Sequence, residues 1–239
     1  LGQPEDVNDE PTRALIAAER PDAVCVCAFG ALIREPLLSA HPMLNVHPSL
    51  LPRWRGAAPV ERAIMAGDRD TGVSIMELTA GLDSGPVSAR QREPIAAQDT
   101  YGTLAPRLAQ IGGELLVEVL DERPAPVPQD EEAVTSAEKI TPADRELRPE
   151  LPAVQLQRTV RALSPHIGTF VSMAPVGRLG VVCARVGEDD LVEAGSLSLE
   201  GPLPVLGCSE GALELVTVQP PGGRPMSGED YLRGRRSRR

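Results

Sequence analysis

Aromatic residues and lysine are scarce in this 239-residue chain. Aromatics make up only 2% of it, which argues against the stacking platform used by proteins that bind single-stranded nucleic acid. Lys139 is the only lysine among 24 basic residues. No apolar run approaches the roughly 20 residues that a membrane-spanning helix needs, and the acidic start of the chain differs from a secretory signal. We therefore expect a cytoplasmic protein that does not enter a membrane.

Cysteine and histidine are also few. Four cysteines in a chain of this length do not form a disulfide framework. Cys25 and Cys27 alternate in a short apolar run, and we expect them to be reduced and packed in a buried strand as small apolar side chains. The three histidines, His41, His47 and His166, have no partners at the spacing of a metal site. We therefore expect no bound metal.

Charge is unevenly distributed along a chain whose composition is that of a globular protein. Hydrophobic residues make up 41%, charged residues 24%, and the net charge is -10. The acidic residues dominate the first 150 positions, whereas the last seven residues hold five arginines and no acid. A solvated, frayed tail would explain this cluster, and so would an arm that contacts phosphates.

The first 126 residues alternate between helical and extended patterns. A helix is expected from a cap at Asn8 or Asp9 to Arg20, because Pro11 suits its first turn and Pro21 ends it. Strands are expected at 23–28, 43–47 and 72–78, an edge strand at 87–92, and helices at 58–65 and 100–120. This interleaving predicts an α/β fold with a mostly parallel, Rossmann-like sheet.

The pattern changes after residue 126. Six prolines lie among many acidic residues between 123 and 152, which is typical of a linker. An amphipathic helix at 154–163 then precedes short extended segments at 169–173, 180–186, 191–194 and 213–218, which predict a small β domain that forms a barrel. We therefore divide the chain into a catalytic domain (1–126), a linker (127–150) and a carboxyl-terminal β domain with a basic tail (151–239).

Asn45 and His47 are the first candidates for chemistry. Side chains two apart in a strand share a face, so this pair should project together at the carboxyl end of strand 43–47, where open α/β sheets bind ligands. An amide that donates to a developing anion and an imidazole that moves a proton suit a group-transfer reaction. A capping asparagine and a surface histidine are the alternative.

Two segments that follow this strand favour the functional interpretation. The run from Pro48 to Pro59 holds three prolines, the only tryptophan and two arginines, which predicts a rigid binding loop. Asp83 then lies between two glycines just after the strand at 72–78. A carboxylate brought against the imidazole would raise the imidazole pKa and fix its orientation, although a simple turn aspartate is the alternative.

Several motifs carry a resemblance that spans essentially the whole chain. They are the runs 45–59, 71–76 and 81–86, linker residues 134–135 and 137–140, and the segments 218–226 and 231–234. These residues resemble the methionyl-tRNA formyltransferase family, whose catalytic domain is a formyltransferase-type Rossmann-like sheet. The Asn, His and Asp occur in all transferases that use formyltetrahydrofolate, whereas the Pro-Arg-Trp-Arg-Gly-Ala-Ala-Pro loop and the Gln219–Met226 segment are specific to the tRNA enzyme.

The resemblance implies a reaction and a set of site residues. The α-amine of methionyl-initiator-tRNA would attack the formyl carbon of 10-formyltetrahydrofolate, giving formylmethionyl-tRNA. Asn45 would donate to the formyl oxygen, His47 would transfer a proton or stabilise the intermediate as imidazolium, and Asp83 would keep it charged. The folate pocket would be formed by Phe29, Gly30, Ala31, Leu32 and Ile33 together with Ser49, Leu50, Leu51 and Pro52.

The resemblance also implies a site for tRNA, and we expect the enzyme to be a monomer. In the family, the basic face of an OB-type barrel meets the acceptor arm. The matching candidates here are the linker lysine and the arginines near the end of the chain: Lys139, Arg224, Arg233, Arg235, Arg236, Arg238 and Arg239. We expect folate and initiator methionyl-tRNA as partners.

One departure from the family and two alternatives accompany this interpretation. Family members begin with a strand, a helix, a second strand and a basic loop before the point that matches Leu1, so we expect a fragment that keeps the catalytic trio but is a poor enzyme alone. A formyltransferase for a small amine, such as glycinamide ribotide or an amino sugar nucleotide, would share the trio. A non-catalytic remnant that binds tRNA or folate is the second alternative.

Overall fold

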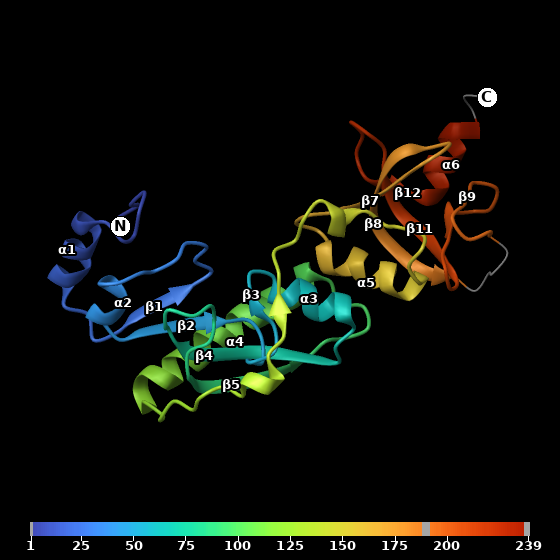
Figure 1. Ribbon diagram of the computed structural model, residues 1–239. Coiled ribbons are helices and arrows are strands. Elements are labelled where there is room, and N and C mark those ends of the chain that lie inside the picture. The colour runs from blue at the N-terminus through green and yellow to red at the C-terminus, as the bar shows by residue number, and fades with distance from the viewer. Residues whose placement is uncertain (1, 188–191, 237–239) are drawn as a thin grey trace. The chain divides into compact units, whose positions relative to one another are not determined.

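The computed structural model describes residues 2–187 and 192–236 (Figure 1). Chain contacts divide the protein into two compact units. Unit 1 comprises Leu1–Pro59, Asp70–Pro94 and Pro106–Glu138, and unit 2 comprises Val60–Arg69, Ile95–Ala105 and Lys139–Arg239. Each unit therefore draws on separate stretches of the chain, and the boundaries expected at 126 and 150 stay a prediction.

A four-stranded sheet forms the centre of unit 1. Its strands run in the order β1 (Val24–Cys27), β2 (Met43–His47), β4 (Asp70–Glu77) and β5 (Val87–Pro94). The Rossmann-like α/β class and the edge position of β5 are confirmed. The expectation of a mostly parallel sheet was wrong for these strands, because only β1 and β2 are parallel and β4 runs antiparallel to both of its neighbours.

Local signals in the sequence explain the first helix. α1 (Glu10–Glu19) is capped by Asp9, whose carboxylate accepts a hydrogen bond from the Thr12 amide at 2.7 Å. The helix ends at Arg20, which adopts a left-handed conformation immediately before Pro21. α1 thus confirms the predicted helix, whereas the short α2 (Leu37–Ala40) had no clear signal.

The two glycines inside α4 (Tyr101–Glu122) have different surroundings. A Cβ added at Gly112 would lie 2.7 Å from Cγ1 of Val46 on β2, whereas one added at Gly113 would meet nothing within 4 Å. Gly112 therefore allows the helix to approach the strand that carries Asn45 and His47. The predicted helix is confirmed despite its low propensity at these positions.

The exposure of β1 differs from the expectation. Cys25 and Cys27 share one face, as predicted, but both are exposed. The alternate residues Val24 and Val26 turn to the other face and pack against a small cluster around Ile33 and Leu37. The cysteines were expected to be buried because the run is apolar throughout, yet β1 lies at one end of the sheet and packs on one face.

Residues of the expected linker are built into unit 1. β3 (Arg55–Gly56) pairs in parallel with β6 (Ser136–Ala137), and Val127 forms a bridge with Val87 of β5. The one-turn 3-10 helix η1 (Glu131–Ala133) lies between these contacts. The composition of this segment indicated a linker, but tertiary hydrogen bonds fix its path.

Unit 2 contains a curled antiparallel half-barrel. Its strand order is β7 (Thr169–Met173), β8 (Gly177–Gly187), β11 (Ala212–Gln219), β10 (Val205–Gly207) and β9 (Leu197–Ser198), and β12 (Met226–Ser227) also pairs with β11. All its pairs are antiparallel. The OB-like class is therefore confirmed, but the strand expected at 191–194 is not formed at 192–194, and residue 191 lies outside the described residues.

Helices and ion pairs complete unit 2. α5 (Ala153–Leu163) confirms the predicted amphipathic helix and buries Leu156 and Val160 in the main apolar cluster. Two ion pairs join α3 (Pro59–Ala66) to later parts of unit 2. Glu61 pairs with His166, which follows α5, and Arg62 pairs with Asp144, which lies in the 3-10 helix η2 (Ala143–Arg145).

The basic end of the chain is more ordered than a frayed tail. α6 (Gly228–Arg236) buries Tyr231 and Leu232, and the arginines at 233, 235 and 236 lie in its last turn. Of the two explanations for the basic cluster, a frayed tail does not hold for these three arginines, because an apolar side of the segment packs into the unit 2 cluster. Arg238 and Arg239 lie outside the described residues.

Residues 2–187 and 192–236 contain neither a membrane-spanning helix nor a cluster of metal ligands. None of the helices combines the length and apolar character needed to cross a membrane. No group of three or more histidine, cysteine or acidic side chains is arranged to hold a metal ion.

Candidate active site

His47 lies at the end of β2 between two hydrogen-bond acceptors. Its side chain is almost fully buried, with the residue 4% exposed, and it pairs across the sheet with Ser74 of β4. Nε2 lies 2.9 Å from the main-chain oxygen of Trp54, to which it donates a hydrogen bond. Nδ1 lies 3.7 Å from Oδ2 of Asp83. The predicted encounter of this imidazole with a carboxylate is therefore present in the structure.

Asp83 is held in place by its own backbone conformation and by a hydrogen bond from β3. It adopts a left-handed conformation with φ of 46°, which aspartate tolerates better than most residues. Its Oδ2 accepts a hydrogen bond from the Gly56 amide at 2.9 Å. A Cβ at the neighbouring Gly85 would overlap the carbonyl of Glu77, so glycine permits this close passage of two backbones.

The protonation state of His47 requires a correction. We expected Asp83 to raise the imidazole pKa and keep the ring charged. The Asp83 carboxylate and the Trp54 carbonyl do act in that direction, but burial disfavours the charged form more strongly and holds the pKa of His47 below its ordinary value. His47 is therefore neutral at neutral pH, and one ring nitrogen keeps a lone pair.

Asn45 lies two residues before His47 on the same face of β2. Its backbone pairs with Met76 of β4, and its side chain is half-buried. Within residues 2–187 and 192–236, the Asn45 carboxamide makes no hydrogen bond. Its two N–H donors are therefore available to a bound carbonyl oxygen.

The loop after β2 has the rigid form that its composition predicts. Trp54 has a positive φ of 64°, and the guanidinium of Arg53 lies 4.4 Å from the centre of the indole ring. The Trp54 amide donates to Oγ1 of Thr135 at 2.9 Å, and the Arg55 amide donates to the main-chain oxygen of Thr135 at 2.9 Å. Thr135, which belongs to the expected linker, thus fixes the loop whose carbonyl binds His47.

Gln129 is a site residue that the sequence interpretation missed. Its Nε2 donates to the main-chain oxygens of Asp83 and Gly85, at 2.8 and 2.7 Å. Its Oε1 accepts from Nε of Arg55 at 3.0 Å. The only signal was an isolated amide between Pro128 and an acidic residue, in a segment with linker composition.

The segment 29–33 offers a surface suited to a flat, apolar ring. Phe29 and Leu32 are 46% and 57% exposed, whereas Ile33 is buried. Asn8 holds the segment by donating to the Leu32 oxygen at 2.9 Å and accepting from the Arg34 amide at 2.7 Å. In the part of the chain that the structure describes, the backbone groups of residues 29–31 form no hydrogen bonds and remain available to a ligand.

The second expected folate segment, 49–52, is bound internally. The Ser49 oxygen accepts from Oγ of Ser74 at 2.7 Å, and the same hydroxyl accepts from the Leu51 amide at 3.1 Å. The Leu51 oxygen accepts from Nε of Arg90 at 2.8 Å. Ser49 and Leu51 are buried, whereas Leu50 and Pro52 are half-buried. This segment can therefore shape a wall, but the backbone groups of Ser49 and Leu51 are already used.

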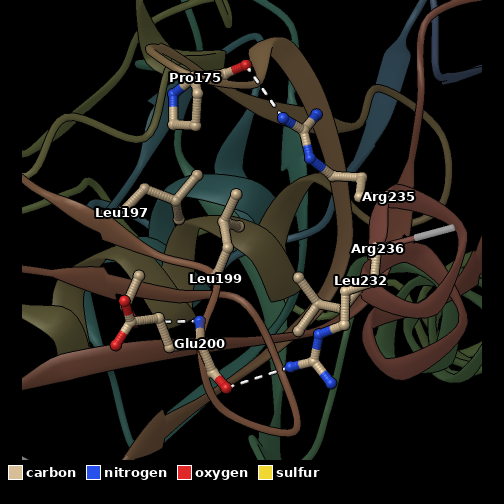
Figure 2. A pocket seen from close by; sticks show the side chains of 8 residues that line it. Pro175, Leu197, Leu199, Glu200, Leu232, Arg235 and Arg236 are labelled. Carbon is tan, nitrogen blue, oxygen red and sulfur yellow. Dashed lines mark hydrogen bonds between the residues drawn. The ribbon is translucent and has the colours of Figure 1, made fainter. Parts of the chain in front are cut away.

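Two of the arginines expected to meet tRNA line a cavity in unit 2. Figure 2 shows Arg235 and Arg236 on α6, with Nη2 of Arg235 bound to the Pro175 oxygen at 3.3 Å and Nη2 of Arg236 bound to the Glu200 oxygen at 3.1 Å. The cavity measures about 470 Å³, and its apolar lining includes Leu197, Leu199 and Leu232. These guanidinium groups are therefore oriented by carbonyls of the half-barrel.

The other expected tRNA residues differ in how far their charge is compensated. Nη1 of Arg233 lies 2.9 Å from Oδ1 of Asp230, one helical turn earlier. Lys139 and Arg224 are exposed, and their side chains have no hydrogen bond or ion pair within residues 2–187 and 192–236. Lys139 and Arg224 thus present the least compensated positive charge of the five.

Comparisons with known proteins agree with this geometry. Residues 2–120 match the family described as formyl transferase, and residues 139–236 match the formyl transferase carboxyl-terminal domain. A methionyl-tRNA formyltransferase from Halorhodospira halophila is 43% identical over 98% of this chain and 77% of its own length.

Two solved structures share the fold. Methionyl-tRNA formyltransferase from Clostridium thermocellum superimposes with a TM-score of 0.64 at 19% identity, covering 81% of each chain. HypX from Aquifex aeolicus, in complex with tetrahydrofolic acid, gives a TM-score of 0.69 at 21% identity, covering 93% of this chain and 41% of its own. The family matches over residues 2–120 and 139–236 and the 43% identity to the curated relative show that the chain belongs to the formyltransferase family, among the methionyl-tRNA formyltransferases.

Proposed function

We propose that this chain transfers the formyl group of 10-formyltetrahydrofolate to the α-amine of methionyl-initiator-tRNA. The observation that carries the proposal is the buried His47–Asp83 pair, with the unpaired Asn45 carboxamide two residues away on the same strand. The names of the curated relatives support the tRNA as acceptor. The product, formylmethionyl-tRNA, serves translation initiation, which places the reaction in the cytoplasm.

Asn45 has the chemistry to stabilise the developing negative charge. The folate supplies an activated formyl group, and attack of the amine nitrogen on the formyl carbon forms the new C–N bond and moves an electron pair onto the formyl oxygen. An N–H donor positioned at that oxygen binds the transition state more strongly than the ground state. Asn45 is suited to this role because neither of its side-chain N–H groups is used by another described residue.

His47 has the chemistry to accept the proton that the amine loses. Burial keeps the imidazole neutral, and Nε2 must carry the proton because a carbonyl oxygen accepts from it. Nδ1 therefore holds the lone pair. Once Nδ1 is protonated, its N–H faces Asp83 while Nε2–H still binds Trp54. The proton then passes to the folate nitrogen as the bond from that nitrogen to the formyl carbon breaks.

Folate and tRNA sites are supported by separate features. For folate, these are the exposed Phe29 and Leu32 and the free backbone of residues 29–31, with 49–52 as a shaping wall. For tRNA, Lys139 and Arg224 are the strongest candidates because their side chains have neither a hydrogen bond nor an ion pair among the described residues. Arg233, Arg235 and Arg236 add positive charge on α6.

A formylation assay tests the proposal. The purified chain is mixed with 10-formyltetrahydrofolate and, in parallel, with charged initiator tRNA, glycinamide ribotide or an amino sugar nucleotide. Formylation of the tRNA alone is expected. Preferential transfer to a small amine would show that the small amine, and not the tRNA, is the acceptor. No transfer from a folded chain that still binds folate or tRNA would instead support a non-catalytic remnant.

A further inference from the structure

Gln129 connects the loop of Asp83 to the loop that follows His47. All of its side-chain hydrogen-bonding groups face protein partners: two N–H donors meet the oxygens of Asp83 and Gly85, and its oxygen meets Arg55. The residue is buried although it lies in a stretch of mainly exposed residues. A buried, fully paired amide at this place is a specific fit and not a solvated side chain.

The bonds of Gln129 restrain the backbone that aims the Asp83 carboxylate. Asp83 has only two side-chain torsions, and its main chain is in the left-handed region, so small changes in this loop move the carboxylate. One amide group binds the carbonyls on both sides of Ser84. It therefore closes the short turn from Asp83 to Gly85 and restrains its main chain.

The other end of the same network reaches the strand that binds the Asp83 side chain. Gly56 of β3 donates its amide to Oδ2 of Asp83, and the adjacent Arg55 donates to Gln129. Arg55 is itself fixed by two hydrogen bonds to Glu131, at 3.0 and 2.7 Å. The carboxylate and the main chain of Asp83 are thus both tied to β3, directly through Gly56 and indirectly through Arg55 and Gln129.

We propose that Gln129 is a positioning residue for Asp83, and that its amide sets the distance between the Asp83 carboxylate and the His47 imidazole. The effect on catalysis rests on the proposed formyl transfer, whereas the effect on the histidine does not. Gln129 touches neither reacting group. It acts on the main chain of Asp83. The carboxylate of Asp83 supplies the charge that acts on His47.

The small number of histidines gives a direct test. With isotope-labelled histidine, the full chain gives signals from only His41, His47 and His166, and their titration by NMR reports the charge near each ring. Gln129→Met keeps the length of the side chain and removes its hydrogen bonds. We expect the pKa of His47 to fall toward that in Asp83→Asn, because the carboxylate moves away.

Two further variants separate positioning from folding. Gln110→Met makes the same change at an exposed glutamine whose side chain bonds to Glu114 on α4, and the titration of His47 should be unchanged. Gln129→Asn keeps a carboxamide that is too short to reach both carbonyls, so it should lower the pKa of His47 less than Gln129→Met does. It serves as the test variant if Gln129→Met fails to fold. Wild-type titration of His47 in a folded Gln129 variant would overturn the proposal.

Kinetics then distinguishes this inference from the proposed function. If the wild type transfers formyl groups, Gln129→Met should lower kcat about 10-fold to 100-fold, as expected for a misplacement of up to 1 Å, with little change in KM for the folate. If the wild type transfers none, the proposed function fails while the titration still decides the role of Gln129. If the titration is unchanged, this inference fails and the proposed function stands.

Discussion

Oδ2 of Asp83 lies 3.7 Å from Nδ1 of His47, yet the carboxylate does not decide the charge of the ring. Burial lowers the pKa of His47 more than the carboxylate and the Trp54 carbonyl raise it. The pair is therefore arranged to receive a proton during a reaction and not to hold one beforehand. This difference leads to the first prediction.

We predict that formyl transfer loses activity toward acid as His47 becomes protonated. Because burial lowers the pKa of His47, the midpoint of this limb should lie below the ordinary value of about 6.5. Asp83→Asn removes a charge that raises that pKa, so the midpoint should move to lower pH and the plateau should fall by about 10². The pH dependence of kcat/KM tests both. A midpoint that moves to higher pH in Asp83→Asn would contradict the assignment.

Asn45→Ala should remove a donor from the formyl oxygen. Loss of one such donor typically lowers kcat by about 10²- to 10³-fold, and KM for the folate should change little because the donor acts on charge that develops later. Steady-state kinetics measures the two constants. Gln110→Ala, at an exposed amide on α4, is the control and should leave both unchanged. An increase in KM with kcat unchanged would assign Asn45 to ground-state binding.

The adjacent glycines of α4 should respond to alanine in opposite directions. In Gly112→Ala the new methyl would lie 2.7 Å from Val46, so the helix must move away from β2, and the free energy of unfolding should fall by about 1–3 kcal/mol. In Gly113→Ala the methyl meets nothing within 4 Å, so helix propensity should raise the free energy of unfolding by about 0.5–1 kcal/mol.

Urea unfolding and formyl-transfer kinetics test this pair of variants. Gly112→Ala should also lower kcat, because Val46 lies between Asn45 and His47. Gly113→Ala should leave the kinetics unchanged. Equal stability of the two variants would show that the close approach of α4 to β2 does not require glycine at position 112.

The Arg62–Asp144 ion pair should stabilise the protein only above acidic pH. Nη1 of Arg62 lies 2.8 Å from Oδ1 of Asp144, and hydrogen bonds from Arg62 and Thr141 outweigh burial and hold the pKa of Asp144 at about 2. A carboxylate whose pKa is lowered by folding stabilises the folded state above its unfolded pKa, and this contribution is lost as the pH falls toward the folded value.

Arg62→Ala tests this dependence. The free energy of unfolding should fall by about 1–2 kcal/mol at pH 7, and the difference from the wild type should shrink between pH 4 and pH 2. Urea unfolding across this range is the measurement. Arg92→Ala removes the exposed pair with Asp70 and should change stability by less than about 0.5 kcal/mol at any pH. A pH-independent loss in Arg62→Ala would assign it to packing.

Binding of tRNA should weaken steeply with added salt. Each phosphate contact contributes about 0.7 to 0.9 to the slope of log affinity against log salt, so Lys139→Ala and Arg224→Ala should each lower both the affinity and this slope. Arg92→Ala is the control because its charge is paired with Asp70. Affinity for tRNA measured from 50 to 300 mM salt gives the slopes. If the affinity of the wild type does not change with salt, the proposed contacts to phosphates are contradicted.

Periodic and local signals predicted most of the secondary structure. The capped α1, strand β2 and the amphipathic α5 follow from residues that lie within a few positions of one another. The same locality placed Asn45 and His47 on one face, because the alternation of a strand depends on nothing distant. The prediction of a mostly parallel sheet was wrong. The direction of a strand depends on the path that the chain takes between strands, and short sequence patterns do not encode this path.

Long-range hydrogen bonds explain what the sequence patterns missed. Gln129 and Thr135 lie in a segment with linker composition, yet they bind residues that are 46 and 81 positions away. Their role depends on the path of β3 and β6, each only two residues long. Segments this short carry no period, so their pairing becomes evident only from the folded chain.

Membership of the formyltransferase family could be predicted from the sequence, because the residue types and the loop motifs around Asn45, His47 and Asp83 suffice to identify it. The arrangement of these groups is a property of the folded chain. Burial of His47 reverses the expected direction of its pKa, exposure of one face of β1 leaves Cys25 and Cys27 accessible, and packing makes Gln129 a support of Asp83. Solvent exclusion and contacts between distant segments belong to the folded chain, and local patterns do not contain them.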